Sequence, residues 1–366
     1  MCIRDRLSVL IKPAGAACNM ACGYCFYHDV ANHRKDFAGV MTYEVMELVI
    51  ARAFACVDDE GSIHFAFQGG EPTLAGLPFF ISFIKRVKEK QHKQQIRYSL
   101  QTNGLLLDEA WALFLKQHDV LTGISLDGYE SLHEHMRKDA QGEKTYWRVL
   151  RAYELLQRHG VKVNILSVVH EESVAHVKAL YHFFIQHKME YVQLIPCLPD
   201  LTKKHRYLSA QGFARFYIEM FHLWHQGISK GHPLHIGLFD DLYLMCMDSL
   251  PLTCGRLGRC AFQYVIEADG TIYPCDFYAL PQFACGTLAT HSLTSARQCE
   301  RAEQFLKQEL PKQCQTCSYL NFCRGGCKRK RDIYLEETIG YCGYREFLVH
   351  VLPIVLADIS YEIECK

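Results

Sequence analysis

The feature that most constrains the fold is a regular alternation of two hydrophobic periods over the first two thirds of the chain. Apolar segments rich in β-branched and aromatic residues, typical of buried strands, alternate with segments whose apolar residues recur every three or four positions, as in helices. The expected strands are 7–11, 63–67, 96–100, 121–126, 161–169 and 191–195. The expected helices are 43–57, 78–92, 108–118, 145–159 and 173–187. This order predicts an α/β fold with a parallel sheet, or a partial (β/α)6 barrel.

Chemically unusual residues follow the first four expected strands. They occupy the segments 18–25, 68–72, 101–104 and 125–128. Since the carboxyl ends of parallel strands meet at one edge of a sheet, where the active sites of such folds lie, these segments are expected to share one site. Gln68, Gln101 and Asn103 would lie at its mouth, where they could hydrogen-bond an extended peptide or simply cap the strand ends.

Composition excludes several classes of protein. The 366 residues include 40 basic and 40 acidic side chains, and 49% of the chain is hydrophobic, which argues against disorder and against nucleic-acid binding by bulk charge. No run of about 18 apolar residues occurs and no signal peptide opens the chain, so we expect a cytoplasmic protein without a membrane partner. Residues 1–6 fit no element and are treated as an artefact or a disordered start.

The cysteines are unevenly distributed. The chain contains 18, of which ten fall within the 89 residues from Cys254 to Cys342. A reducing compartment does not maintain so many disulfides, so metal ligation is the leading use. Before this region we expect helices at 210–226 and 239–249, and within it a hairpin at 262–277 that turns at Asp269-Gly270.

Three cysteines lie on one short segment after the first expected strand. Cys18, Cys22 and Cys25 are separated by three and by two residues. Three thiolates can hold a 4Fe-4S cluster and leave one iron open to a small-molecule ligand, whereas four would complete it. The alternative is a structural zinc ion, for which His28 could be the fourth ligand.

This cysteine motif, with Tyr24 before its last cysteine, resembles the signature of the radical S-adenosylmethionine (radical SAM) enzymes. The stretch Gly69-Gly70-Glu71-Pro72 resembles their glycine-rich motif, whose backbone meets the methionyl amino group. Glu71 offers an acceptor for an ammonium or a ribose. The resemblance implies that the open iron binds S-adenosylmethionine and that its cleavage gives a 5′-deoxyadenosyl radical. It assigns contacts with this cofactor to Tyr24, Gly69, Ser125, Arg137 and Leu198. Without the resemblance, the glycines could form a tight turn and Arg137 could be a solvated cation.

Eight further cysteines resemble the ligands of the SPASM auxiliary-cluster domain, which occurs in radical enzymes that modify peptides. The resemblance implies two more 4Fe-4S clusters with interleaved ligands, three clusters in all, and the alternative is two zinc sites. The ligands of the first auxiliary cluster would be Cys254, Cys260, Cys275 and Cys327. Those of the second would be Cys314, Cys317, Cys323 and Cys342. The expected bounds are 7–235 for the partial barrel, 236–342 for the SPASM domain and 343–366 for a C-terminal helix.

Longer phrases resemble the anaerobic sulfatase-maturating enzymes, among them Ile11-Lys12-Pro13-Ala14, Ser99-Leu100-Gln101-Thr102-Asn103-Gly104 and Tyr273-Pro274-Cys275-Asp276-Phe277-Tyr278. The resemblance implies oxidation of a cysteine or serine in a sulfatase polypeptide to Cα-formylglycine. It implies that Asp276 is the base, where the alternative is an acceptor that only orients the cluster loop. The expected partners are the sulfatase and a low-potential electron donor such as ferredoxin or flavodoxin.

Two other functions are weighed against this one. Another SPASM enzyme could form thioether or carbon-carbon crosslinks in a peptide, although only a short segment precedes Cys18 and leaves no room for a peptide-binding domain there. A non-catalytic iron-sulfur or zinc regulator could bind RNA through the basic run 328–331. The sequence does not decide between cysteine and serine, nor does it identify the sulfatase, the reductant, the oligomeric state or the electron route.

Overall fold

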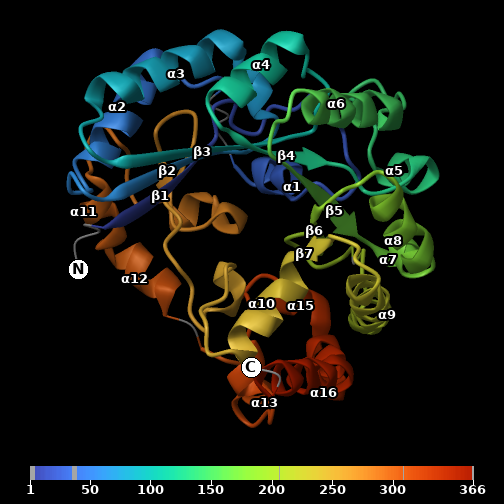
Figure 1. Ribbon diagram of the computed structural model, residues 1–366. Coiled ribbons are helices and arrows are strands. Elements are labelled where there is room, and N and C mark those ends of the chain that lie inside the picture. The colour runs from blue at the N-terminus through green and yellow to red at the C-terminus, as the bar shows by residue number, and fades with distance from the viewer. Residues whose placement is uncertain (1–4, 35–38, 206, 308, 365–366) are drawn as a thin grey trace. The chain divides into compact units, whose positions relative to one another are not determined.

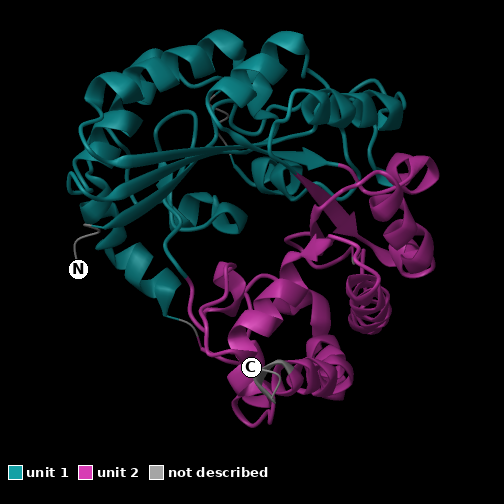
Figure 2. Ribbon diagram, viewed as in Figure 1, with its two compact units in different colours: residues 1–125, 136–163, 261–307 teal, residues 126–135, 164–260, 308–366 magenta. Residues whose placement is uncertain are grey.

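The computed structural model describes residues 5–34, 39–205, 207–307 and 309–364 (Figure 1). The chain forms two compact units that alternate along the sequence (Figure 2). Unit 1 comprises 1–125, 136–163 and 261–307, and unit 2 comprises 126–135, 164–260 and 308–366. These units are defined by compactness, so the domain bounds at 235/236 and 342/343 stay a prediction.

Unit 1 is built on a largely parallel sheet, in the order β4-β3-β2-β1-β8-β9. Its strands are β1 (Arg6–Ile11), β2 (Ser62–Phe67), β3 (Gln95–Thr102), β4 (Leu121–Ser125), β8 (Val265–Ile266) and β9 (Ile272–Tyr273). β1 pairs in parallel with β2 on one side and with β8 on the other, and β8 and β9 form the expected antiparallel hairpin. The carboxyl ends of β1 to β4 therefore share one edge, as the sequence predicted.

Helices α2, α3, α4 and α6 cover one face of this sheet, and α1 lies on the other side (Figure 1). The α-helices of unit 1 are α1 (Phe26–Asn32), α2 (Tyr43–Phe54), α3 (Leu77–Lys90), α4 (Glu109–Gln117), α6 (Tyr146–Arg158), α11 (Leu293–Arg297) and α12 (Glu300–Leu306); the 3-10 turns are η1 (Pro72–Ala75), η3 (Asp276–Tyr278) and η4 (Pro281–Phe283). Side-chain oxygens fix two helix starts, since Thr42 accepts from the Val45 amide and Asp108 from the Trp111 amide. Between sheet and helices, Phe65 and Phe67 of β2 pack edge-on against Phe83 of α3.

Unit 2 contains a second parallel set of strands, in the order β7-β6-β5, and is otherwise helical. Its strands are β5 (Val163–Val169), β6 (Tyr191–Pro196) and β7 (His235–Ile236), with a separate pair β10 (Leu335–Glu336) and β11 (Tyr341–Cys342). Its helices and 3-10 turns are α5 (Glu130–Met136), α7 (Glu171–Val174), α8 (Val177–Gln186), α9 (Ala210–Ser229), α10 (Gly237–Cys246), η2 (Cys254–Arg256), α13 (Lys312–Gln315), α14 (Leu320–Cys323), α15 (Arg331–Tyr334), η5 (Glu337–Ile339) and α16 (Gly343–Glu364). The long helix α9 packs against α7, α8, α15 and α16, with Phe221, Phe239 and Phe347 in contact at the centre.

Two expectations need correction. The excluded start takes part in the sheet, because β1 begins at Arg6 and the Asp5 carbonyl accepts from the Ser62 amide at 2.9 Å; residues 1–4 lie outside the described part. The expected helix 173–187 is two helices, α7 and α8. The Ser173 hydroxyl accepts from the amide of His170 and caps the start of α7, whereas His176, at φ −123° and ψ 20°, leaves helical geometry and separates α7 from α8. No helix among the described residues is long and apolar enough to cross a membrane.

Candidate active site

The segment with Cys18, Cys22 and Cys25 forms the loop between β1 and α1. Backbone hydrogen bonds anchor it within unit 1, from the Ala21 amide to the Lys138 carbonyl and from the Gly23 amide to the Met136 carbonyl, each at 2.9 Å. Two donors approach the Cys18 sulfur, the Met20 amide at 3.3 Å and the Asn103 side-chain amide at 3.7 Å. Polarised N–H groups around cysteine sulfur are typical of iron-sulfur sites, where they tune the cluster potential.

Burial raises the pKa of the Cys18 thiol to about 12, so this thiol holds its proton unless a metal replaces it. In the described part of the chain, no three His, Cys, Asp or Glu side chains converge at the spacing of a single metal ion. A cubane spreads its thiolates over separate irons, and the donor set of this loop, three thiols with nearby N–H donors, fits such a cluster.

The glycine-rich motif clamps this cysteine loop. The Gly70 amide donates to the Gly15 carbonyl at 2.9 Å, and the Glu71 amide donates to the Ala17 carbonyl at 2.7 Å. A β-carbon on Gly70 would lie 2.2 Å from the Ala17 carbonyl oxygen, so no larger residue fits. The glycines are thus required by close backbone approach, and the predicted cofactor contacts of Gly69 and Gly70 stay a prediction.

The Glu71 side chain hydrogen-bonds other residues of unit 1. Its carboxylate is 1% exposed and accepts four hydrogen bonds, from the Thr73 amide and hydroxyl, the Thr102 hydroxyl and the Asn103 amide, at 2.6–3.0 Å. Burial raises the pKa of Glu71, although these four donors oppose the shift. Three of these hydrogen bonds go to Oε1 and one to Oε2, and the predicted contact of Glu71 with the cofactor stays a prediction.

Three predicted residues at the strand ends have partners within unit 1. The Asn103 side-chain amide donates to the Asn19 side chain at 2.7 Å as well as facing Cys18, so Asn103 holds the cysteine loop. The Gln101 side-chain amide donates to the Ser125 hydroxyl at 3.0 Å. Gln101 is a predicted contact with the peptide, and Ser125 is a predicted contact with the cofactor. The roles of Gln101 and Ser125 towards ligands are not settled by this bond and stay predictions.

Arg137 is not a solvated cation. It is 6% exposed, its guanidinium lies 5.5 Å from the centre of the Tyr24 ring, and one nitrogen is 3.9 Å from the Cys22 sulfur. The cation therefore sits beside the loop that would carry the cluster, where an anionic group is favoured. Leu198 belongs to unit 2, where it is buried directly after β6.

Asp276 belongs to a buried chain of charges that extends through Lys12 and Glu267 to Arg34. The Lys12 ammonium lies 2.9 Å from Asp276 and 3.1 Å from Glu267, and Arg34 lies 2.6 Å from Glu267. The Tyr27 hydroxyl donates to the other oxygen of Asp276 at 2.5 Å. Burial lowers the pKa of Lys12, but the two carboxylates outweigh it and the net shift is upward. Lys12 and Tyr27 thus contact the two oxygens of Asp276, which directly follows the predicted ligand Cys275.

Sequence reasoning missed Lys12 and Tyr27. Burial, followed by the charge of Asp276, raises the pKa of Tyr27 well above its usual value, so this hydroxyl remains a donor. Gln68 also hydrogen-bonds the Tyr27 side chain, which places it in the same group. A lysine at the end of an apolar strand was the one available signal for Lys12, since its side chain is only 1% exposed.

The four predicted ligands of the second auxiliary cluster gather within unit 2. Cys314, Cys317, Cys323 and Cys342 interact electrostatically with one another. Backbone amides point at two of their sulfurs, from Gly325 to Cys323 and from Arg345 to Cys342, each at 3.4 Å. This donor set fits a 4Fe-4S cluster.

Three predicted ligands of the first auxiliary cluster are also in unit 2. Cys260 lies within electrostatic range of Cys327, and a β-carbon on Gly255, next to Cys254, would lie 3.3 Å from the Cys327 β-carbon. The fourth, Cys275, is in unit 1, at the start of η3.

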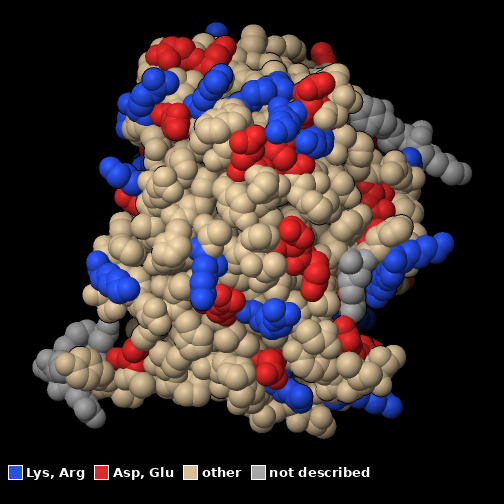
Figure 3. Space-filling view, turned by 90° about the vertical axis from the view of Figure 1, so that its right-hand side faces the viewer, with Lys and Arg blue, Asp and Glu red and all other residues tan. Residues whose placement is uncertain are grey.

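The basic run 328–331 is not a solvated face. Arg329 and Arg331 are 4% and 8% exposed, and Arg329 donates to the Pro199 carbonyl and pairs with Asp332. Lys and Arg are interspersed with Asp and Glu on the face shown in Figure 3. The alternative of RNA binding through this run is therefore not supported.

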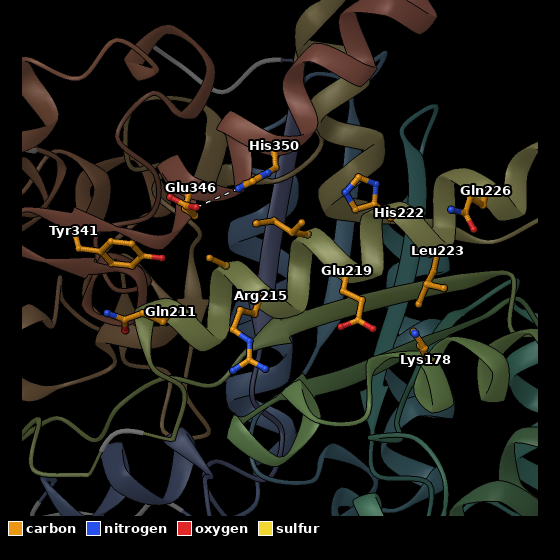
Figure 4. Close-up of a pocket in the computed structure, with 12 residues that line it drawn as sticks. Lys178, Gln211, Arg215, Glu219, His222, Leu223, Gln226, Tyr341, Glu346 and His350 are labelled. Atoms are coloured by element: carbon orange, nitrogen blue, oxygen red, sulfur yellow. Dashed lines mark hydrogen bonds and ion pairs between the residues drawn. The ribbon is translucent and has the colours of Figure 1, made fainter.

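A groove of about 830 Å3 lies in unit 2 along α9 (Figure 4). Arg215, Glu219 and His222 of α9 line it together with Glu346 and His350 of α16, which lie 3.2 Å apart. None of the predicted site residues lines this groove.

Comparisons with known proteins show the family of the chain. Residues 13–184 match the radical SAM superfamily, and residues 254–318 match the iron-sulfur cluster-binding SPASM domain. A cysteine-type anaerobic sulfatase-maturating enzyme of Clostridium perfringens (strain 13 / Type A) is 37% identical over 360 residues, which cover 95% of this chain and 96% of that protein. A serine-type enzyme of Klebsiella aerogenes is 31% identical over 87% of this chain and 79% of its own length.

The solved structure of native anSMEcpe with bound AdoMet and Kp18Cys peptide is 34% identical and has a TM-score of 0.89. The match covers 97% of this chain and 99% of that chain. It confirms the fold class, a radical SAM partial barrel followed by a cysteine-rich SPASM region. On these grounds, the chain belongs to the anaerobic sulfatase-maturating enzymes of the radical SAM superfamily.

Proposed function

We propose that this enzyme forms Cα-formylglycine on a sulfatase polypeptide with Asp276 as the base. The observation that carries this assignment is the buried contact of Asp276 with Lys12 and Tyr27, at 2.9 and 2.5 Å, one residue after Cys275. Asp276 and the loop with Cys18, Cys22 and Cys25 belong to the same compact unit.

The chemistry sets the requirements. Converting a cysteine side chain to a thioaldehyde removes one hydrogen atom from Cβ, one further electron and the thiol proton. S-adenosylmethionine and the iron-sulfur clusters supply the radical that takes the hydrogen atom and the acceptor for the electron. The protein must supply the base, and the Asp276 carboxylate, buried beside Lys12 and Tyr27, is the group proposed to accept the proton. Water then hydrolyses the thioaldehyde to the aldehyde and releases sulfide.

Lys12 and Tyr27 position this base. Each binds a different oxygen of Asp276, so the carboxylate cannot rotate freely. Because the Lys12 ammonium is shared with Glu267, proton uptake by Asp276 leaves that ammonium with one carboxylate partner and Glu267 with both cations. The four groups sum to zero charge before the proton transfer and to +1 after it, and Glu267 then faces both cations.

The cofactor complement that fits the chain is S-adenosylmethionine with three 4Fe-4S clusters. Eleven cysteines at the family positions support this number, three for the first cluster and eight for the two auxiliary clusters. A cytoplasmic location and a low-potential donor such as ferredoxin or flavodoxin are in keeping with these oxygen-sensitive groups.

Cysteine is the preferred target residue in this proposal. The cysteine-type relative shares 37% of its residues with this chain over 95% of the chain, against 31% over 87% for the serine-type relative. A thiol is also easier to deprotonate than a hydroxyl, which suits a carboxylate base.

The test uses the anaerobic holoenzyme, S-adenosylmethionine, a reductant and two peptides that differ only in Cys or Ser. Mass spectrometry distinguishes the products, since the Cys peptide exchanges sulfur for oxygen and loses two hydrogens, whereas the Ser peptide loses two hydrogens only. Asp276→Asn should lower formylglycine formation by at least about 100-fold, the usual scale for a lost general base. Iron content and 5′-deoxyadenosine release should stay measurable. Undiminished turnover of Asp276→Asn would exclude the base role.

A further inference from the structure

Arg331 is linked by hydrogen bonds to both groups of cysteines in unit 2, to the first directly and to the second through Gly325. Its backbone amide donates to the carbonyl of Cys327, a predicted ligand of the first auxiliary cluster, at 3.0 Å. Its guanidinium donates to the Gly325 carbonyl at 2.8 Å, and the Gly325 amide in turn donates to the sulfur of Cys323, a predicted ligand of the second, at 3.4 Å. One buried residue thus lies next to both predicted clusters.

The charge of Arg331 also reaches both groups. The guanidinium lies within electrostatic range of the Cys260 sulfur, in the first group, and of the Cys314 sulfur, in the second. In the described part of the chain, no carboxylate pairs with Arg331, in contrast to Arg329, which pairs with Asp332 at 3.0 Å. A guanidinium does not lose its proton in proteins, so this positive charge is permanent.

We propose that Arg331 is a shared cation that raises the reduction potentials of both auxiliary clusters and so enables them to accept the electron from the substrate. The inference rests on the proposed function. Reduction adds one negative charge to a cluster, and a buried cation stabilises that charge more strongly than an exposed one because the surroundings are less polarisable.

The alternative is that Arg331 only holds the backbone at Gly325. Two substitutions separate these roles. Arg331→Gln keeps an N–H donor for the Gly325 carbonyl but removes the charge. Arg331→Lys keeps the charge but replaces the planar fork with a single ammonium. If the charge of Arg331 matters, the lysine variant should have the midpoint potentials of the reference protein. If only the hydrogen bond to Gly325 matters, the glutamine variant should have them.

Arg329→Met is the matched control. Arg329 is two residues away and equally buried, but its charge is already paired with Asp332. Asp332 retains Lys203 as a partner at 2.8 Å when Arg329 is removed, so the control leaves no orphaned carboxylate there.

The experiment is a redox titration, without peptide, of the anaerobic full-length protein that carries only the two auxiliary clusters, monitored by electron paramagnetic resonance. All variants are made in a Cys18→Ala, Cys22→Ala, Cys25→Ala background, so that only the auxiliary clusters contribute. We expect Arg331→Gln to shift both midpoint potentials to more negative values, Arg331→Lys to stay near the reference, and Arg329→Met to change little.

Two outcomes would overturn the proposal. One is an Arg331→Gln protein with full iron content and unchanged potentials. The other is loss of iron in both the Gln and the Lys variants, which would make Arg331 a structural residue. Neither outcome affects the proposed function, because no substrate is turned over in this measurement and Asp276 is unaltered.

Discussion

At the scale of single residues, the site depends on a buried row of alternating charges, Arg34, Glu267, Lys12 and Asp276. Each inner member contacts two opposite charges at 2.6–3.1 Å. Such a row is stable only when complete, because taking charges out of water costs several kcal/mol per ion and only close opposite charges repay it. In the proposed function, Arg34, Glu267 and Lys12 therefore act only through Asp276 and do not contact the substrate.

Lys12→Met should lower the free energy of unfolding by about 3–5 kcal/mol, the usual cost of breaking a buried ion pair. The pKa of Lys12 is raised above 10.5 in the folded protein, so its contribution is fully present below that pH and disappears only as pH rises through the raised pKa. The loss should therefore be the same at pH 7 and pH 9, measured as the thermal midpoint of the anaerobic enzyme.

Lys93→Met is the control for this change. Lys93 pairs with Glu60 at 3.3 Å on the surface, with both side chains largely exposed, and such pairs contribute little to stability. Equal midpoints for Lys12→Met and Lys93→Met would contradict the buried network.

Sequence alone could predict the cysteines and Asp276 but not Lys12 or Tyr27. The cysteines form local motifs with fixed spacing, and Asp276 adjoins one of them. Tyr27 and Asp276, in contrast, are 249 residues apart in the chain. A contact at that separation follows from the pairing of β8 with β1, which no local pattern in either segment specifies.

At the scale of elements, the strands were the most predictable part. The six expected strands are all present, and their bounds shift by at most two residues, because each contains a short run of buried apolar residues that ends at a polar or turn segment. The helix 173–187 was wrong as one element because its apolar stripe continues across the break at His176. Helix α1 was missed because it is short and follows directly from the cysteine loop.

Gly70→Ala tests how the end of β2 holds the cysteine loop. The added methyl group would lie 2.2 Å from the Ala17 carbonyl oxygen and 2.6 Å from the Ala16 carbonyl carbon, both backbone atoms. We expect the loop to shift, with loss of the N-terminal cluster and of 5′-deoxyadenosine release. Iron analysis and chromatography of the nucleoside measure both.

Gly237→Ala is the matched control, since no atom lies within 4 Å of the β-carbon position at the start of α10. It should keep its iron and its cleavage activity. A Gly70→Ala enzyme with full iron and normal cleavage would show that the close contact does not hold the loop.

At the scale of the whole molecule, the chain does not divide into compact parts in sequence order. The hairpin of β8 and β9 belongs to unit 1 although it lies between cysteines of unit 2. Alternation of strands and helices predicts layers but not where a later hairpin adds to an earlier sheet. The sequence therefore predicted the fold class and the cysteine groups, while the arrangement of compact units came only from the structure.

The cysteine groups should nevertheless be separable by function. With three clusters the anaerobic enzyme should contain about 12 irons per chain, and replacing one complete ligand group by alanine should leave about 8.

Removal of Cys18, Cys22 and Cys25 should abolish 5′-deoxyadenosine release in the presence of dithionite. Removal of Cys314, Cys317, Cys323 and Cys342 should preserve that release and abolish formylglycine, because the proposed electron route through both auxiliary clusters is then interrupted. If the variant without Cys314, Cys317, Cys323 and Cys342 still forms the aldehyde at the normal rate, the second auxiliary cluster serves structure rather than electron transfer. If the wild-type protein contains zinc in place of iron, the assignment of all three cluster sites is wrong.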